Sequence, residues 1–342
     1  MSSIQIQSRT ISSNSSVFII AEAGDNHMGK LDAAIEMCWQ AKLAGCDCIK
    51  FQHHIPDEEM LKDVPTSTNF NMPLYEFLKK HALKIQDHKK LKSYCDGIGI
   101  IYLCTPFSFK AAEELNSIGV EAFKIGSGEM TDLPTLAKIA KFGKPMIIST
   151  GMSTYEEIKR TYDLISEFGI DFALTNCTSE YPARYEDINL KVLDKMIQMF
   201  PNAVIGHSDH TPDLYTCFAA VALGASIIEK HVTLNKNIIC PDQTVSIDFH
   251  DMHMLVDGIR KIELSLGNEK KLNANEKEIR DWAFRSIVSI CDIKAGAKIT
   301  PKMIWSKRPG TGIPSYMMPN IIGKHATRDI KKDTLISWSD IQ

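Results

Sequence analysis

Eight short runs rich in apolar and β-branched residues recur along the chain, about 30 residues apart. Each run is apolar at consecutive positions, which is typical of strands buried on both faces of a parallel sheet. They cover residues 17–24, 46–52, 99–105, 121–129, 144–150, 171–182, 203–211 and 225–233. The spacing is that of one βα unit, so eight units predict a (β/α)8 TIM barrel.

The segments between these runs show the apolar spacing of helices. Residues 30–45 and 154–169 follow this pattern, and both end at glycine, a common helix stop. The segment 53–98 is longer and carries a polar loop, PDEEMLKDVPTSTNFNMP, ahead of its helix. We therefore expect helices to surround the strands.

The chain changes character near residue 267, where a charged stretch begins. Beyond it, DIKAGAKIT and DIKKDTLIS resemble each other and predict an internal repeat of short strands and turns. The expected division is a barrel at 1–266 with a polar hairpin segment at 1–16, a linker at 267–282, and a small mainly-β domain at 283–342.

Composition excludes several classes of function. The formal net charge is -3 without a long basic run, so no nucleic-acid partner is expected. No apolar stretch reaches the roughly 20 residues of a membrane span, and the polar N-terminus lacks the layout of a signal peptide. Nine cysteines without a CxxC motif indicate reduced thiols in a cytoplasmic protein.

Polar side chains stand at the carboxyl ends of all eight predicted strands. In a TIM barrel these ends meet at one face, where the active site is built. Contact with solvent explains one or two polar ends, but not this whole selection. The residues are Glu22, Lys50, Gln52, Thr105, Lys124, Ser127, Glu129, Ser149, Asn176, Ser179, Ser208, Asp209, His210, Glu229, Lys230 and His231.

His210 and His231 end two consecutive strands. Neighbouring strands lie about 5 Å apart, so both imidazoles can bind one divalent metal. Glu22 follows on the next strand when the barrel closes, and it can add a carboxylate or hold a metal-bound water. Such a set suits Mn²⁺, Fe²⁺, Co²⁺ or Zn²⁺ and can polarise a carbonyl. Either histidine alone is better explained as a hydrogen-bonded structural residue; the pair favours a metal site.

Lys50 and Lys124 end the second and fourth strands, and two interpretations stay open for them. A lysine there can form a Schiff base with a carbonyl substrate, or it can act as a point charge for a phosphate or carboxylate. Serine hydroxyls around the ring favour the anion site. These are Ser127, Ser149, Ser179 and Ser208.

A set of short motifs, in order along nearly the whole chain, resembles the sialic acid synthase family, the phosphoenolpyruvate-dependent nonulosonic acid synthases. Residues 283–342 resemble the antifreeze-like (SAF) domain that ends these enzymes. The motifs are EAGDNHMG, IKFQHH, CTPFS, FKIGSGEM, STGMST, CTSEYP, GHSDHTPD, EKHVT and KRPGTG.

The resemblance implies a metal-assisted reaction, with Mn²⁺ as the first choice of metal and Mg²⁺ or Co²⁺ as alternatives. Phosphoenolpyruvate condenses with the open-chain aldehyde of an N-acetylmannosamine-type sugar, and cleavage of its C–O bond releases phosphate. The nine-carbon product is N-acetylneuraminate.

The resemblance also implies a role for each barrel residue at the matching positions. The catalytic set is Glu22, Glu129, His210 and His231, with the two histidines as metal ligands. Phosphoenolpyruvate is bound by Lys50, Lys124, Ser127, Ser149, Ser179 and Ser208. The sugar is bound by Gln52, Thr105, Tyr181 and Asp242. Glu229 matches a family carboxylate that is either catalytic or supporting.

Arg308 matches an arginine that the SAF domain of one subunit places over the barrel of its partner. The resemblance thus implies a domain-swapped homodimer in which Arg308 from the partner subunit contacts the sugar and Phe284 packs at the same lid. Taken alone, Arg308 is equally explained as an exposed turn cation.

Three alternatives remain. The chain departs from the family at Asp25, where a small aliphatic residue is usual, and at Met28 and Cys240. These departures leave the sugar open, so a legionaminate or pseudaminate synthase using a 2,4-diacetamido-2,4,6-trideoxyhexose is the first alternative. A phosphoenolpyruvate–aldose phosphate synthase is the second, and a non-catalytic binding protein is the third.

Overall fold

Eight parallel strands form the centre of the first of two units, Met1–Leu266 and Gly267–Gln342, into which the chain divides. The computed structural model describes residues 2–65, 70 and 72–342. The strands are β3 (Phe18–Glu22), β4 (Cys48–His53), β5 (Ile101–Pro106), β6 (Phe123–Ile125), β7 (Met146–Ser149), β8 (Phe172–Cys177), β9 (Val204–Asp209) and β10 (Ile227–His231).

The strands follow the order β5-β4-β3-β10-β9-β8-β7-β6, so the first strand of the ring pairs with the last. Glu22 is in register with both His231 on β10 and Lys50 on β4. The sheet is a nearly closed barrel, which confirms the predicted (β/α)8 fold.

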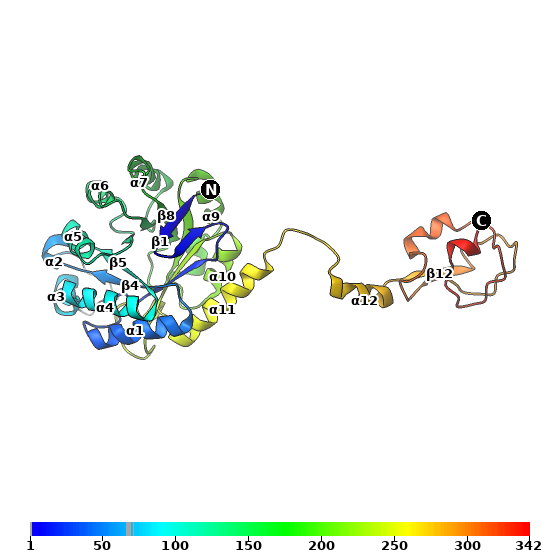
Figure 1. The fold of residues 1–342 in the computed structure, drawn as a ribbon, viewed down its shortest axis with the longest axis horizontal. Coiled ribbons are helices and arrows are strands. Elements are labelled where there is room, and N and C mark those ends of the chain that lie inside the picture. Colours follow the sequence, from blue (N-terminus) through cyan, green and yellow to red (C-terminus); the bar gives the residue numbers. More distant parts are fainter. Residues whose placement is uncertain (1, 66–69, 71) are drawn as a thin grey trace. The chain divides into compact units, whose positions relative to one another are not determined.

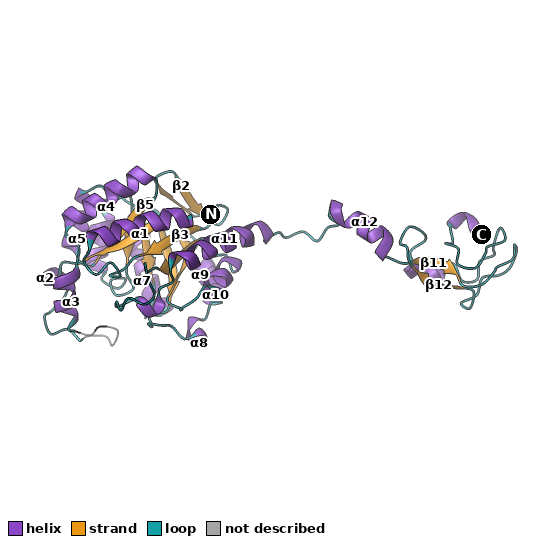
Figure 2. Cartoon of the chain, turned by 90° about the horizontal axis from the view of Figure 1, so that it is seen from below, coloured by secondary structure: helices purple, strands orange, loops and turns teal. Residues whose placement is uncertain are grey.

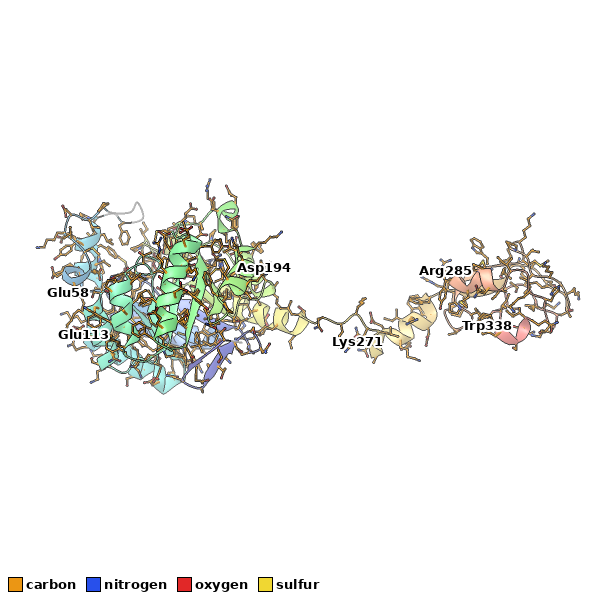
Figure 3. The ribbon with its side chains drawn as sticks, turned by 90° about the horizontal axis from the view of Figure 1, so that it is seen from above. Glu58, Glu113, Asp194, Lys271, Arg285 and Trp338 are labelled. Carbon is orange, nitrogen blue, oxygen red and sulfur yellow. The ribbon has the colours of Figure 1, made fainter. Side chains whose placement is uncertain are left out.

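Helices surround this barrel, as Figures 1 and 2 show. Their outer faces carry exposed charged side chains such as Glu58, Glu113 and Asp194 (Figure 3). The helices are α1 (Leu31–Ala44), α2 (Pro56–Glu59), α3 (Leu74–His81), α4 (Ile85–Ile98), α5 (Phe109–Ser117), α6 (Leu133–Ala140), α7 (Tyr155–Glu167), α8 (Tyr185–Ile188), α9 (Val192–Met199), α10 (Tyr215–Ala222) and α11 (Phe249–Ser265).

Local sequence explains where the predicted helices begin and end. Helix α7 begins with a capping box between Thr154 and Glu157, which satisfies two free backbone N–H groups. Helix α1 ends at Gly45, whose φ of +87° favours glycine. The expected polar loop, residues 56–73, contains the short helix α2 and is followed directly by helix α3, and its residues 66–69 and 71 lie outside the described residues.

The barrel has two apolar layers. One lies between the strands and the helices, and it includes Ile19 and Phe51. The other fills the inside of the barrel at the amino ends of the strands, where Phe18 packs with Ile4 and Ile11. The last two residues belong to an N-terminal hairpin of β1 (Ser3–Ile6) and β2 (Arg9–Ser12), which therefore closes that end of the barrel.

The second unit is small and has its own apolar core. Its elements are α12 (Ala274–Ala283), β11 (Ser286–Ser289), β12 (Ile304–Lys307) and the 3₁₀ turns η2 (Ser315–Asn320) and η3 (Trp338–Asp340).

The two similar segments of the second unit lie side by side with matching contacts. Ile293 and Ile330 exchange both backbone hydrogen bonds at 2.8 Å. Asp292 accepts from the Lys332 N–H at 2.8 Å, and Asp329 accepts from the Ala295 N–H at the same distance. The sequence similarity thus corresponds to a local symmetry.

All nine cysteines are free, and eight of them are buried. Within the described residues, no helix combines the length and apolar character that crossing a bilayer requires.

Candidate active site

The inward-facing side chains change from apolar to polar along each strand. On β3, Phe18 and Ile20 belong to the inner core, and Glu22 lines a cavity. On β4, Cys48 belongs to the same core, and Lys50 lines the same cavity. Inward residues are two positions apart in a strand, so the strands build an apolar floor beneath a polar site at their carboxyl ends.

This cavity has a volume of about 530 Å³. Every barrel residue to which the family resemblance gives a role lines it, whereas the strand-end candidates Asn176, Asp209 and Lys230 do not. The set is Glu22, Lys50, Gln52, Thr105, Lys124, Ser127, Glu129, Ser149, Ser179, Tyr181, Ser208, His210, Glu229, His231 and Asp242.

Lys50 is buried among acceptors. Its Nζ lies 2.8 Å from Glu22 Oε2, 3.2 Å from Thr105 Oγ1 and 3.5 Å from Glu229 Oε1. Burial lowers the pKa of Lys50, but Glu22 and Glu229 raise this pKa by more. The ammonium therefore stays protonated, which fits a point charge and not a Schiff-base nucleophile.

Lys124 is the less neutralised of the two lysines. Its Nζ donates to Ser149 Oγ at 2.6 Å and lies 3.7 Å from Glu229 Oε1. Burial lowers the pKa of Lys124, and Glu229 opposes the shift only in part. An anion entering the cavity would supply the missing counter-charge.

Glu229 connects the two lysines and accepts from Ser208 Oγ at 3.1 Å. Burial raises the pKa of Glu229, whereas Lys124 and Lys50 lower it by more, so the carboxylate is ionised. These contacts are those of a charge-balancing residue. The other two serines lie nearby: Ser127 Oγ accepts from the Gly151 N–H at 3.0 Å, and Ser179 Oγ lies 3.8 Å from Cys177 Sγ.

The rings of His210 and His231 lie 5.1 Å apart between centroids. His210 Nδ1 donates to the Thr178 carbonyl at 2.8 Å, and His231 Nδ1 lies 3.4 Å from Asp242 Oδ2. An oxygen beside Nδ1 orients a metal-binding histidine and leaves Nε2 as the ligand atom. Tyr181 OH lies 3.3 Å from His210 Nε2.

Two imidazoles, each with an oxygen near its Nδ1 atom, fit a divalent metal whose other positions are open to water and substrate. Among residues 2–65, 70 and 72–342, no group of three or more His, Cys, Asp or Glu side chains is arranged to hold a metal. The residues therefore fit a two-histidine site completed by substrate and water.

Asp209 and Lys230 also stand at predicted strand ends, but they lie on the outer side of the barrel. Lys230 Nζ lies 2.6 Å from Asp209 Oδ2, and Thr216 of α10 donates to Asp209 Oδ1 at 2.6 Å. The alternation within a strand explains this, because each residue is next to an inward-facing histidine.

Gln52 links Glu22 to the loop after β4. Its Nε2 donates to Glu22 Oε1 at 2.7 Å, and its Oε1 lies 3.2 Å from His54 Nε2. Glu129 is folded back over Gly126, where a Cβ atom would collide with its carboxylate. Burial raises the pKa of Glu129 to about 7, so this carboxyl is poised to exchange a proton near neutral pH.

Several cavity residues were missed by the sequence reasoning. They include Asp25, His54, Glu59, Phe107, Met152 and Cys177. The two-residue period of a strand could have predicted His54 and Cys177. His54 lies two positions beyond the inward-facing Gln52, and Cys177 lies two positions beyond the inward-facing Thr175. Glu59 comes from α2 in the long loop, where no strand period applies.

Arg308 and Phe284 belong to the second unit. Arg308 Nε donates to the Ala283 carbonyl at 3.1 Å, and its guanidinium lies 5.2 Å from the centroid of the Trp282 ring. Phe284 is 56% exposed and packs beneath Arg280 at 4.9 Å. Gly310 meets Phe284 so closely that a Cβ atom would collide. The two predicted residues thus share one exposed surface.

Comparison with known proteins agrees with this architecture. Residues 37–271 match the NeuB family, and residues 284–342 match the SAF domain. The chain belongs to the NeuB family. This NeuB-family enzyme is 37% identical to the N,N'-diacetyllegionaminic acid synthase of Legionella pneumophila, with 96% of each chain covered. It is 34% identical to the mouse N-acetylneuraminate-9-phosphate synthase, covering 95% of this chain and 92% of the relative.

A solved structure is similar as well. The N-acetylneuraminic acid synthetase of Leptospira borgpetersenii, in complex with citrate, matches the NeuB-family chain with a TM-score of 0.75 and 30% identity, covering 81% of this chain and 94% of that one. The protein is therefore a metal-dependent, phosphoenolpyruvate-dependent nonulosonic acid synthase that uses an amino sugar. This confirms the predicted family and enzyme class.

Proposed function

We propose that this enzyme condenses phosphoenolpyruvate with unphosphorylated N-acetylmannosamine to form N-acetylneuraminate and phosphate. One observation carries the proposal: a cationic pair, Lys50 and Lys124, and an imidazole pair, His210 and His231, line one cavity of about 530 Å³. The first pair suits the phosphate and carboxylate of phosphoenolpyruvate. The second suits a metal beside the sugar aldehyde.

In the proposed reaction, Lys50 and Lys124 hold the two anionic groups of phosphoenolpyruvate. The predicted serines supply hydroxyl donors to the same groups: Ser127, Ser149, Ser179 and Ser208. Mn²⁺ on His210 and His231, with Mg²⁺ or Co²⁺ as alternatives, would polarise the aldehyde oxygen as a Lewis acid.

The bond forms between C3 of phosphoenolpyruvate and the aldehyde carbon, and the aldehyde oxygen becomes a hydroxyl by taking a proton from Glu129. The electron-poor C2 then takes up water, and Glu22, already hydrogen-bonded to Gln52, accepts the proton. The tetrahedral C2 expels phosphate by C–O cleavage, which leaves the keto group. Glu129, which is protonated in part at neutral pH, lies at the same cavity and can donate to the sugar.

Charge supports a sugar without phosphate. Within the described part of the cavity wall, the lysines are Lys50 and Lys124, and the acids Asp25, Glu59, Glu129 and Asp242 line the remaining surface. A second phosphate would meet these carboxylates without a cation of its own, which is unfavourable. Gln52, Thr105, Tyr181 and Asp242 supply uncharged or accepting groups for sugar hydroxyls.

A second candidate is an N,N'-diacetyllegionaminate synthase acting on 2,4-diacetamido-2,4,6-trideoxymannose. The 37% identity to the Legionella synthase over 96% of both chains favours it. Pseudaminate synthesis from an isomeric trideoxy sugar belongs to the same alternative.

We further propose a domain-swapped homodimer, in which Arg308 of the partner subunit contacts the N-acyl group and Phe284 packs beside it. Support comes from the exposed surface that holds both residues. Nine free cysteines are consistent with a cytoplasmic location.

The deciding experiment is phosphate release from phosphoenolpyruvate with Mn²⁺, with N-acetylmannosamine and the trideoxy sugar compared at equal concentration. Faster release with N-acetylmannosamine supports the first candidate, and faster release with the trideoxy sugar supports the second. Release only with a sugar 6-phosphate would contradict both. No release with any of these sugars would contradict the proposed reaction.

A further inference from the structure

Asp25 is a buried carboxylate that the proposed reaction leaves unused. It follows β3 directly after Gly24, it lines the cavity, and its residue surface is 5% exposed. Within the described residues its side chain makes no hydrogen bond and no ion pair. Burial raises the pKa of Asp25 to about 6. The oxygens of Asp25 are not among the fully buried, unpaired side-chain atoms of the described residues, so they open into the cavity. The carboxylate can therefore accept a hydrogen bond from a molecule that enters the cavity.

The surrounding protein groups are already occupied or carry the wrong charge. His54 acts on Asp25 electrostatically, but its Nδ1 lies 2.9 Å from Glu59 Oε1 and its Nε2 lies 3.2 Å from Gln52 Oε1. Asp242, Glu22 and Glu59 raise the pKa of Asp25 and cannot donate to it when ionised. The missing hydrogen-bond donor must therefore come from what enters the cavity.

Asp25 also has a fixed position. Gly24 has a φ of +48°, and a Cβ atom there would collide with the carboxylate of Asp242. The backbone before Asp25 is thus held against the loop that orients His231, since Asp242 Oδ2 lies 3.4 Å from His231 Nδ1. A donor bound to Asp25 consequently lies in the part of the cavity where His54 and Asp242 act on this carboxylate.

We propose that Asp25 is a specificity-determining residue whose carboxylate accepts a hydrogen bond from a hydroxyl or amide N–H of the acceptor sugar. This inference rests on the proposed function and deepens it, because it defines the sugar as one with a donor at that point. A sugar with a methyl or an anionic group there would leave Asp25 unpaired or repelled.

The test compares Asp25→Val and Asp25→Asn with the wild-type enzyme on N-acetylmannosamine, on its single 4-deoxy and 6-deoxy analogues, and on the trideoxy sugar. A hydrogen bond to a charged acceptor predicts a loss of roughly 10- to 150-fold in kcat/KM for the sugar in Asp25→Val. The KM for phosphoenolpyruvate should not change. With the analogue that lacks the partner group, wild type and variant should be equal, and that analogue identifies the donor.

The melting temperature Tm distinguishes the proposed role from a structural one. A structural role predicts that Asp25→Val lowers Tm, whereas the proposed role predicts a rise. Removing an unpartnered buried carboxylate should raise the Tm of Asp25→Val. Asp257→Asn replaces an exposed acid on α11 and is the matched control. It should change neither kcat/KM for the sugar nor Tm. A lower Tm of Asp25→Val with an unchanged KM for every sugar would overturn the inference. An equal loss of kcat/KM for all sugar analogues would overturn it as well.

Failure of the proposed function would be seen separately, as no phosphate release by the wild-type enzyme with any sugar. In that case calorimetric binding of N-acetylmannosamine and the trideoxy sugar decides the inference. Weaker binding to Asp25→Val than to the wild type supports it, and equal or absent binding overturns it.

Discussion

Lys230 and Asp209 form an ion pair of 2.6 Å on the outer side of the barrel, with both side chains 1% exposed or less. Each is the immediate neighbour of a predicted metal ligand, His231 or His210. Lys230 also donates to the Thr211 carbonyl just beyond β9. The pair therefore fixes β9 against β10 on the outer side of the barrel. This also fixes the relative position of the two imidazoles on the cavity side.

Replacing Lys230 by Met should lower the free energy of unfolding by about 3–5 kcal/mol, because Asp209 would stay buried without its partner. Urea unfolding measures the change. Lys261→Met is the matched control, since Lys261 pairs with Asp257 at the same 2.6 Å while both are exposed. There the change should stay below about 1 kcal/mol. Equal losses of unfolding free energy in Lys230→Met and Lys261→Met would contradict the role given to burial.

Metal removal should abolish turnover. Dialysis against a chelator is expected to stop phosphate release, and Mn²⁺ should restore it, because the two imidazoles leave positions for substrate. His210→Ala and His231→Ala should bind no Mn²⁺ by calorimetry while keeping wild-type circular dichroism. His253→Ala, at an exposed position of α11, serves as the control and should behave as wild type. Full activity in either cavity variant would refute the metal site.

Lys124→Met should reduce kcat/KM for phosphoenolpyruvate by roughly 10- to 150-fold, the value of one charge-assisted contact. The KM for the sugar should change little, because Lys124 contacts Ser149 and Glu229 on the anion-binding side. Steady-state kinetics with each substrate varied in turn separates the two. Lys138→Met, at an exposed position of α6, is the control. A loss of kcat/KM for the sugar alone would contradict the assignment of Lys124 to phosphoenolpyruvate binding.

Acid should destabilise the barrel unit through three buried histidines, His27, His53 and His88. Burial lowers the pKa of each, for His27 to about 4. The folded state therefore favours the neutral ring, and its stability is complete above the unfolded pKa of about 6.5. These three rings should therefore lower stability as the pH drops from 6.5 towards 4, while Glu129 and Asp25, whose pKa values are raised, act in the opposite direction. Urea midpoints at pH 7.5, 6 and 5 measure the trend.

His88→Phe should flatten this pH dependence, since it removes one of the titrating rings. The same substitution at exposed His253 should leave the slope unchanged. If both variants keep the wild-type dependence of stability on pH, the effect does not come from the buried ring of His88.

The swapped dimer predicts complementation. Arg308→Ala and His231→Ala should each be inactive alone, and a mixture unfolded and refolded together should regain about a quarter of wild-type activity. Half of the random dimers are mixed, and each mixed dimer has one intact site of two. No recovery would mean that each site is built within one chain.

The sequence predicted the eight strands because both faces of each strand are buried, and a continuous apolar run records this directly. It predicted the cavity residues at the strand ends because the carboxyl ends of the strands meet at one face of a barrel, whereas Tyr181 and Asp242 came only from the family resemblance. Asp209 and Lys230 stood among the strand-end candidates, yet they face outward, and only the two-residue alternation beside His210 and His231 separates them.

Other residues could not be found this way. Asp25 lies in a turn after β3, and its neighbour Asp242, whose charge raises the pKa of Asp25, is more than 200 positions away in the sequence. Glu59 reaches the cavity from a short helix in a long loop, whose path no periodicity specifies. The sequence suggested a hairpin at 1–16 but gave no sign that its isoleucines fill the barrel floor.

That hairpin has a consequence for the order of events on the ribosome. Its residues are synthesised before the eight barrel strands, yet the space they occupy is enclosed only after β10 has paired with β3. Because a growing chain emerges from its N-terminus, Ile4, Ile6 and Ile11 must wait, exposed, until more than 200 further residues have been made. A segment that is made before all eight barrel strands is thus among the last to become buried.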